Sequence, residues 1–196
     1  MPPNWNNVGG LPSKSYQCGH CDNRVASAVG YFSSGSTGII VEIIYICPHC
    51  ARATSFYDGV QFPGVRPGTK VLSVPDDIEK AYSEARNCMA SSAFTAAAML
   101  CRKILMHIAV EKGAAAGESF KSYVEYLANA RYVPPNGKEW VDHIRDKGNE
   151  MNHELVFASE AEANDVLGFV EMLLKFIYEF PSRVGSKPAT PAAKIS

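Results

Sequence analysis

The chain has 196 residues, 46% of them hydrophobic and 20% charged, which suits one folded domain of ordinary size plus a small one. Its formal net charge of -1 excludes a general attraction to polyanions, so nucleic-acid binding would have to come from a local basic patch. No apolar run reaches membrane-spanning length, and the N-terminal sequence MPPNWNNVGG lacks the features of a secretory signal. We therefore expect a cytoplasmic protein without a membrane segment.

The N-terminal region predicts an arm followed by a small sheet. Residues 1 to about 15 are rich in Pro, Gly and Asn without a period, which predicts a loosely held arm. β-Branched and aromatic residues dominate 25–32 and 39–46, with a Ser-rich turn between them, and these two stretches predict strands. The first predicted domain is therefore 1–57. Residues 58–73 contain Pro and Gly without an apolar period and predict a linker.

Four of the six cysteines form two C-x-x-C pairs, Cys18 with Cys21 and Cys47 with Cys50. Two thiolates at this spacing reach one tetrahedral ion when the backbone between them folds into a tight knuckle, and two knuckles close the coordination shell. A closed shell leaves no position for water or substrate, so the pattern predicts one structural Zn²⁺ in a zinc ribbon and no small-molecule cofactor. The alternatives are a chance pairing of reduced thiols and, less favoured because neither pair opens a helix in a βαβ unit, a redox dithiol.

The remaining cysteines and two histidines are expected to have other roles. With four thiolates available, His20 and His49 inside the knuckles are expected to be exposed or to lie just outside the coordination shell. Cys88 and Cys101 stand among apolar residues at helical spacing and are expected as buried core thiols.

A thin basic patch accompanies the ribbon. Lys14, Arg24 and Arg52 stand near the knuckles and are candidate contacts to nucleic acid or to a partner, and Arg102 in the helical region is a fourth. A few basic residues are more commonly a solvated surface, so this indication is weak.

From Pro75 the sequence changes to helical spacing. Ser91 or Ser92 is expected to cap the second helix, and Pro181 is expected to end the last one. The predicted helices cover approximately 75–89, 91–113, 119–130, 138–152 and 159–181. The predicted fold class is α+β: a small β zinc ribbon, then an all-α bundle of about five helices at 74–181, then a tail at 182–196.

Arg145, Asn149 and His153 recur at intervals of four residues within the fourth predicted helix. At about 100° per residue they form one polar stripe. An arginine that binds phosphate, an amide that orients it and a histidine that moves a proton are the groups needed to cleave RNA through its own 2′-hydroxyl without a metal. The alternative is that these residues only end the helix and pair with neighbouring acids, because polar stripes are ordinary on surface helices.

Several stretches of the helical region follow the pattern of a known family. They are the Val-Pro-Asp-Asp-Ile opening at 74–78, Tyr82 with Glu84 and Ala85, Leu100-Cys101-Arg102 with Leu105, the Ile-Arg-x-x-Gly-Asn-x-x-x-His stretch at 144–153, and the helix at 170–181 with Tyr178 and Pro181. With these features, residues 74–181 resemble the domain of unknown function family numbered 4145, in which an N-terminal zinc ribbon is a frequent companion. Met106 departs from the pattern, since the family usually has Glu there.

That family is grouped with HEPN domains, so the resemblance implies a HEPN-like helical bundle. Such bundles act as ribonucleases or as dimerising partners of nucleotidyltransferases and defence proteins. In active HEPN ribonucleases an arginine directly precedes a polar residue, commonly Asn, and a histidine follows about a turn later. Asn149 and His153 match that half of the motif, whereas Gly148 occupies the arginine position and Arg145 lies one turn upstream.

Two functions follow from these observations. The favoured one is an interaction module, an accessory or regulatory component of a prokaryotic defence or nucleic-acid-processing system, whose partner is a second copy of the chain or another protein. The alternative is a metal-independent ribonuclease that acts on RNA as a dimer through Arg145, Asn149 and His153. Fold kinship does not grant activity, so the sequence leaves open whether the protein is an enzyme.

Overall fold

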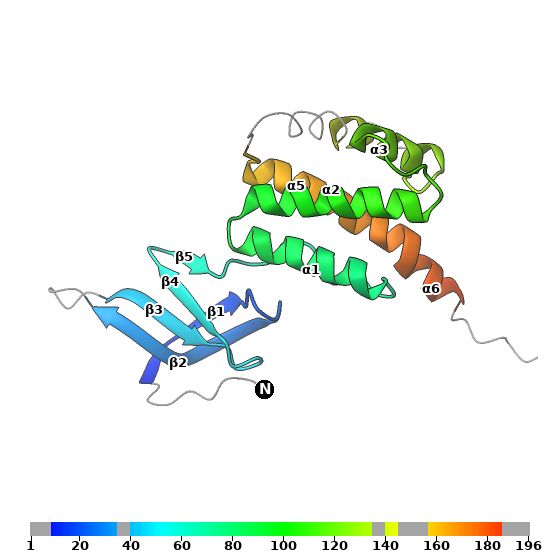
Figure 1. The fold of residues 1–196 in the computed structure, drawn as a ribbon. Helices are drawn as coiled ribbons and strands as arrows, with labels where there is room; N and C mark the ends of the chain where they lie inside the picture. The colour runs from blue at the N-terminus through cyan, green and yellow to red at the C-terminus, as the bar shows by residue number, and fades with distance from the viewer. Residues whose placement is uncertain (1–8, 35–39, 135–139, 145–156, 186–196) are drawn as a thin grey trace, which may run out of the picture.

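The computed structural model describes residues 9–34, 40–134, 140–144 and 157–185. Within these residues an antiparallel five-stranded sheet is followed by a bundle of helices, and α1 is the helix of the bundle nearest the sheet (Figure 1). The α+β class predicted from the sequence is confirmed. No described helix is both long and apolar enough to span a membrane.

The sheet is a simple meander in which each strand pairs with the next one along the chain. The strands are β1 (Gly9–Gln17), β2 (Arg24–Ser34), β3 (Ile40–Ile46), β4 (Ala53–Tyr57) and β5 (Val60–Phe62). β2 and β3 confirm the two strands predicted at 25–32 and 39–46.

The prediction of a loose arm is wrong for residues 9–15, because they belong to β1 and pair with β2. The composition was misleading because β1 is an edge strand, and edges and bulges are where sheets tolerate proline. The register of β1 shifts between Gly10 and Lys14, next to Pro12, whose carbonyl accepts a hydrogen bond of 2.9 Å from the hydroxyl of Tyr45.

A few aromatic residues and the cysteines make up the interior of the sheet region. The rings of Tyr16, Tyr45 and Phe56 contact one another, with centroids 5.3 to 6.1 Å apart. Leu11 and two of the cysteines complete this small cluster. So little apolar surface cannot stabilise an independent domain without a cross-link or a metal ion.

The predicted linker 58–73 joins the sheet to the bundle but is more ordered than its composition suggests. It begins with β5, and residues 63–72, which we call the strap, bind to the helical bundle along their length. Val71 lies in the core of the bundle, and the backbone N–H of Gly64 donates to the carbonyl of Ala90 at 2.8 Å. The backbone N–H of Leu72 donates to the carboxylate of Glu179 at 3.0 Å. The strap has no apolar period because its partners come from distant parts of the chain.

The bundle is built around α2 (Phe94–Glu111), which contacts α1 (Asp76–Ala90), α3 (Phe120–Asn129) and α5 (Glu160–Leu174). The described part of a further helix covers 140–144. Phe169 of α5 is fully buried and meets the ring of Trp140 edge-on. α5 is therefore a central helix of the bundle, as its apolar circumference suggests.

The predicted starts of two helices, at 119 and 159, agree with the structure, and in both a serine close in sequence caps the first turn. Ser119 accepts a hydrogen bond from the N–H of Ser122 at the start of α3. Ser159 and Glu162 form a capping box at the start of α5.

The predicted cap of α2 by Ser91 or Ser92 is wrong. Ser92 has a φ of 58° and, with Ala93, closes the end of α1: their N–H groups donate to the carbonyls of Met89 and Cys88. This is a Schellman ending, and it uses the two serines to finish one helix rather than to begin the next. Ala93 then precedes α2 without a side-chain cap.

Pro181 does not end the last helix, contrary to prediction. α5 continues through a π-helical turn, η2 (Lys175–Glu179), into α6 (Phe180–Gly185). Pro181 is the second residue of α6, within a first turn where a missing N–H is tolerated after the wide π turn. The predicted tail is therefore helical at 182–185, and its remainder lies outside the described residues.

Candidate metal centre

The four cysteines of the two C-x-x-C pairs meet in one place. Their sulfur atoms all lie within 4.8 Å of one another. The Sγ atoms of Cys18 and Cys50 are 3.8 Å apart, and those of Cys21 and Cys47 are 3.9 Å apart. A tetrahedral ion about 2.3 Å from each thiolate requires sulfur atoms about 3.8 Å apart, so the residues fit a metal ion. The spacing is far too long for a disulfide, whose sulfur atoms are about 2 Å apart.

The backbone explains why the thiols converge, since the two knuckles repeat one conformation. In each, the first cysteine exchanges backbone hydrogen bonds of 2.8 to 3.0 Å with residues four and five positions later: Cys18 with Asp22 and Asn23, Cys47 with Ala51 and Arg52. The residue at the fourth position is left-handed in both, with a φ of 61° at Asp22 and 56° at Ala51. These turns aim both thiols of a pair at the same point.

Burial opposes ionisation of the thiols at this site. It raises the pKa of the Cys18 thiol, and hydrogen bonds from the backbone of His20 and Cys21 offset this only in part. A buried group of four sulfurs holds several thiolates only if a cation offsets their charge. The donor set therefore fits a soft or borderline metal ion.

The histidines of the knuckles are outside this group of sulfurs, as expected. His20 donates from Nε2 to the carbonyl of Ala53 at 2.9 Å, and the Nδ1 atom of His49 accepts from the Asn23 amide at 3.2 Å. Both contacts join one knuckle to the strand or knuckle opposite. Cys101 is buried in the helical core, as predicted for a structural thiol, and Cys88 is half-buried against that core.

The structure adds a charged cluster beside the metal centre. Asp22, directly after Cys21, accepts two hydrogen bonds from Arg66 of the strap, at 2.9 and 2.8 Å, and one from Arg86 of α1, at 3.0 Å. Arg86 is only 4% exposed, and its guanidinium also donates to the carbonyls of Pro67 and Gly68. We call these three charged residues the Asp22–Arg66–Arg86 cluster.

The sequence-based predictions missed this cluster because Arg66 and Arg86 are 44 and 64 residues away from Asp22 along the chain. One signal was available. Arg86 interrupts the apolar face of α1 next to Tyr82, Ala85 and Met89, which are all buried. An arginine at such a position needs a partner with a negative charge.

Gly19 allows the first knuckle and the strap to approach each other. A Cβ atom at this position would lie 2.2 Å from the carbonyl oxygen of Gly64 and 2.6 Å from that of Pro63. The role of Gly19 in the structure includes this close contact, which no side chain would permit.

Three residues of the predicted basic patch belong to the ribbon, whereas the fourth, Arg102, lies in the helical bundle. Lys14 lies over the ring of Phe56, 4.6 Å from its centroid, while the side chains of Arg24 and Arg52 are exposed on the ribbon. Arg102 belongs to α2, where it is buried with its guanidinium 4.4 Å from the ring centroid of Phe120. Burial lowers the pKa of Arg102.

The candidate catalytic residues Arg145, Asn149 and His153 lie outside the described residues. The helix that leads toward them is anchored at 140–144, where Val141 and Ile144 are buried in the bundle core.

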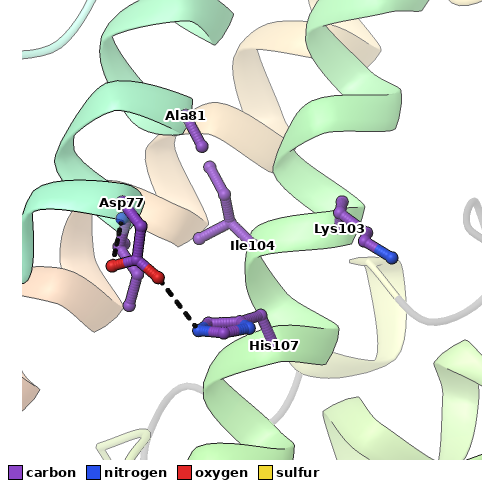
Figure 2. A pocket seen from close by; sticks show the side chains of 6 residues that line it. Asp77, Ala81, Lys103, Ile104 and His107 are labelled. Carbon is purple, nitrogen blue, oxygen red and sulfur yellow. Dashed lines mark hydrogen bonds and ion pairs between the residues drawn. The ribbon is translucent and has the colours of Figure 1, made fainter.

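A shallow groove lies between α1 and α2. It has a volume of about 180 Å³ and is lined by Asp77, Ile78, Ala81, Lys103, Ile104 and His107. The carboxylate of Asp77 and the ring of His107 face each other at 3.7 Å across it (Figure 2). Asp77, Lys103 and His107 are all exposed, so the groove offers solvated charges above an apolar floor. Such an ion pair contributes little, and this arrangement favours no particular reaction.

Comparison with known proteins places the helical region in a family. The model of DUF4145, a domain of unknown function, matches residues 83–193, more than half of the chain. The match starts within α1 and extends beyond α6, so the ribbon lies outside it. No significant match was found among curated proteins or among solved structures.

Proposed function

This chain belongs to the DUF4145 family, and we propose that it is an interaction module in which a structural zinc ribbon is fixed on a HEPN-like helical domain. Its role is that of an accessory or regulatory component, binding a protein partner or a second copy of the chain, in a prokaryotic defence or nucleic-acid-processing system. The HEPN-like character rests on the family resemblance and is compatible with the helical bundle built around α2.

One observation carries the proposal: four sulfur atoms at tetrahedral spacing, two from each of two matching knuckles. Zinc is the metal that four thiolates in this geometry bind most commonly in structural sites. Zn²⁺ bound there would cross-link the two knuckles. Cys18, Cys21, Cys47 and Cys50 fill all four positions, so the site supports a structural role and not catalysis.

The outer surface of the ribbon supports a binding role. Tyr57 and Val60 are cross-strand neighbours on β4 and β5, and Phe62 follows on the same face. All three side chains are exposed. A small sheet with this much exposed apolar surface is typical of proteins that contact a partner.

Zinc content and self-association test this proposal together. Purified protein should contain one zinc per chain by elemental analysis, and light scattering should show a dimer or a complex at high concentration. Replacing Phe62 and Val60 with Ser should weaken that association without releasing zinc. A chain that binds no zinc, or that remains monomeric and captures no partner, contradicts the proposal.

The second candidate, a metal-independent ribonuclease, is favoured by the polar stripe of Arg145, Asn149 and His153 in the sequence. If this stripe is catalytic, the protein should cleave RNA in the presence of a chelator. His153→Ala should then lower the rate about a hundredfold or more through loss of proton transfer. Arg145→Ala should lower it through loss of phosphate stabilisation. A wild-type protein that cuts no RNA in a broad panel leaves the interaction module as the function.

A further inference from the structure

We propose that the metal centre acts as a latch: metal binding holds the strap and α1 against the ribbon through Asp22, and metal loss releases them. This inference depends on the zinc site of the proposed function and adds a conformational role to it.

The first knuckle fixes the position of Asp22. The backbone N–H of Asp22 donates to the carbonyl of Cys18 at 3.0 Å, and its φ of 61° turns the chain at the end of the knuckle. Asp22 directly follows the ligand Cys21. The metal holds Cys18 and Cys21 in place, so it also holds the carboxylate that lies between the strap and α1.

Arg86 makes this carboxylate important to the helical domain. Its side chain is almost fully buried, and the carbonyls of Pro67 and Gly68 satisfy its N–H groups without neutralising its charge. Asp22 supplies the negative charge. The Asp22 side chain is 29% exposed, but Arg86 is buried, so loss of Asp22 leaves an uncompensated buried charge, which costs more than losing an exposed pair. A knuckle that unfolds without its metal therefore destabilises the packing around Arg86.

The strap is linked to the same knuckle by two further contacts. Arg66 bridges Asp22 and the side-chain carbonyl of Asn87 on α1, at 3.2 Å from the latter. The backbone of Gly64 fits against Gly19 and donates to Ala90 at the end of α1. The first knuckle, the strap and α1 are thus joined by one continuous set of contacts. Of these three segments, only the knuckle depends on the metal for its structure.

Thermodynamic linkage makes this coupling reciprocal. If the metal favours the docked strap, then docking must raise the affinity for the metal by the same factor. Residues that hold metal ligands from outside the coordination shell commonly change metal affinity by about 10-fold to 100-fold when substituted. Asp22→Asn removes the charge that faces Arg66 and Arg86 and keeps the shape of the side chain.

Hydrogen exchange of the full chain tests the latch. The amide of Gly64 should exchange slowly with zinc bound and at least about tenfold faster after chelation, while amides in the middle of α5 change little. In Asp22→Asn the Gly64 amide should exchange fast even with zinc bound, and chelation should add little. Zinc affinity measured by competition with a chelator should fall about 10-fold to 100-fold. The matched control is Asp58→Asn, at an exposed turn residue that shares a positive φ with Asp22, and it should behave as wild type.

The outcomes separate the latch from the zinc site. Unchanged exchange at Gly64 after zinc removal overturns the latch and leaves the zinc ribbon in place, whereas a wild-type chain without zinc overturns the proposed function itself. Wild-type zinc affinity and exchange in Asp22→Asn overturn the role given to Asp22. If that variant does not fold, Arg66→Gln removes the strap side of the same contact and should give the same accelerated exchange at Gly64.

Discussion

The ribbon and the helical bundle differ in how much apolar core stabilises them. The bundle encloses a large apolar core in which residues such as Leu105, Phe169 and Leu173 are fully buried. In the ribbon, the core cluster buries only Leu11, Tyr16, Tyr45 and two cysteines, with a few partly buried side chains such as Phe56 packed against them. Apolar burial is sufficient for the first region, whereas the second has four thiols placed where a metal ion could cross-link them. The proposed dependence of the ribbon on metal is consistent with its small core.

Removing one ligand should have the largest effect and should show that only the ribbon depends on metal. Cys47→Ala should release zinc and unfold the ribbon, because structural zinc contributes about 10 kcal/mol or more to small zinc domains. Elemental analysis and the near-ultraviolet signal of Tyr16 and Tyr45 would detect this, and far-ultraviolet circular dichroism should show most of the helix retained. Cys88→Ala is the matched control and should keep its zinc. A Cys47→Ala protein with full zinc occupancy would contradict the four-thiolate site.

A cavity in the bundle should have the opposite effect: it should destabilise the helices and leave the zinc content unchanged. Leu105 is completely buried at the centre of α2, so Leu105→Ala should lower the free energy of unfolding by about 2 to 5 kcal/mol. Zinc content should remain at one per chain after purification of the folded protein. Met99→Ala, on an exposed position of the same helix, should have little effect. Equal effects of the two substitutions would show that α2 is not the core of the bundle.

A carboxylate that holds the strap should make stability depend on pH. Burial raises the pKa of Glu171, but hydrogen bonds from Lys175 and Thr69 outweigh this effect, and the net pKa is lowered. A lowered pKa in the folded state means that the stabilisation is present above the pKa of the unfolded chain, about 4.3. It is lost as the pH falls through the folded value. Glu171→Gln should cost about 1 kcal/mol at pH 7 and much less in acid, which thermal unfolding at several pH values would measure. An equal cost at both pH values would contradict this assignment.

The smallest expected effect concerns the backbone of the second knuckle. Ala51 has a φ of 56°, a conformation that costs a residue with a Cβ atom about 1 kcal/mol. Ala51→Gly should stabilise the ribbon by about 0.5 to 1 kcal/mol and slow zinc release to a chelator. The same change at Ala53, within β4, should destabilise it by a similar amount. Destabilisation by both substitutions would mean that the strain at Ala51 is not significant.

The sequence-based predictions are correct where a structure depends on residues close together in the chain, and they fail where it depends on residues far apart. The starts of the helices predicted at 119 and 159 agree with the structure, where Ser119 and Ser159 each accept a hydrogen bond from a backbone N–H three residues later. Ser91 and Ser92 were assigned to the wrong helix because two helices compete for them. β1 was missed because its pairing with β2, and not its own composition, makes it a strand. The position of Arg145, Asn149 and His153 stays a prediction.

The sequence by itself determined which four cysteines form the candidate metal site, the class of the fold and the family, because these depend on spacing within a few residues or on patterns along one helix or strand. The tertiary structure alone decided that the segment after the ribbon is a strap, that Gly19 must be glycine, and that Asp22 neutralises Arg86. Each of these depends on groups brought together from 44 to 64 residues apart or on a close approach of two backbones. Such contacts arise only when the whole chain packs. The residues next to a buried charge, or next to a closely approached carbonyl, do not show in the sequence which distant group it will meet.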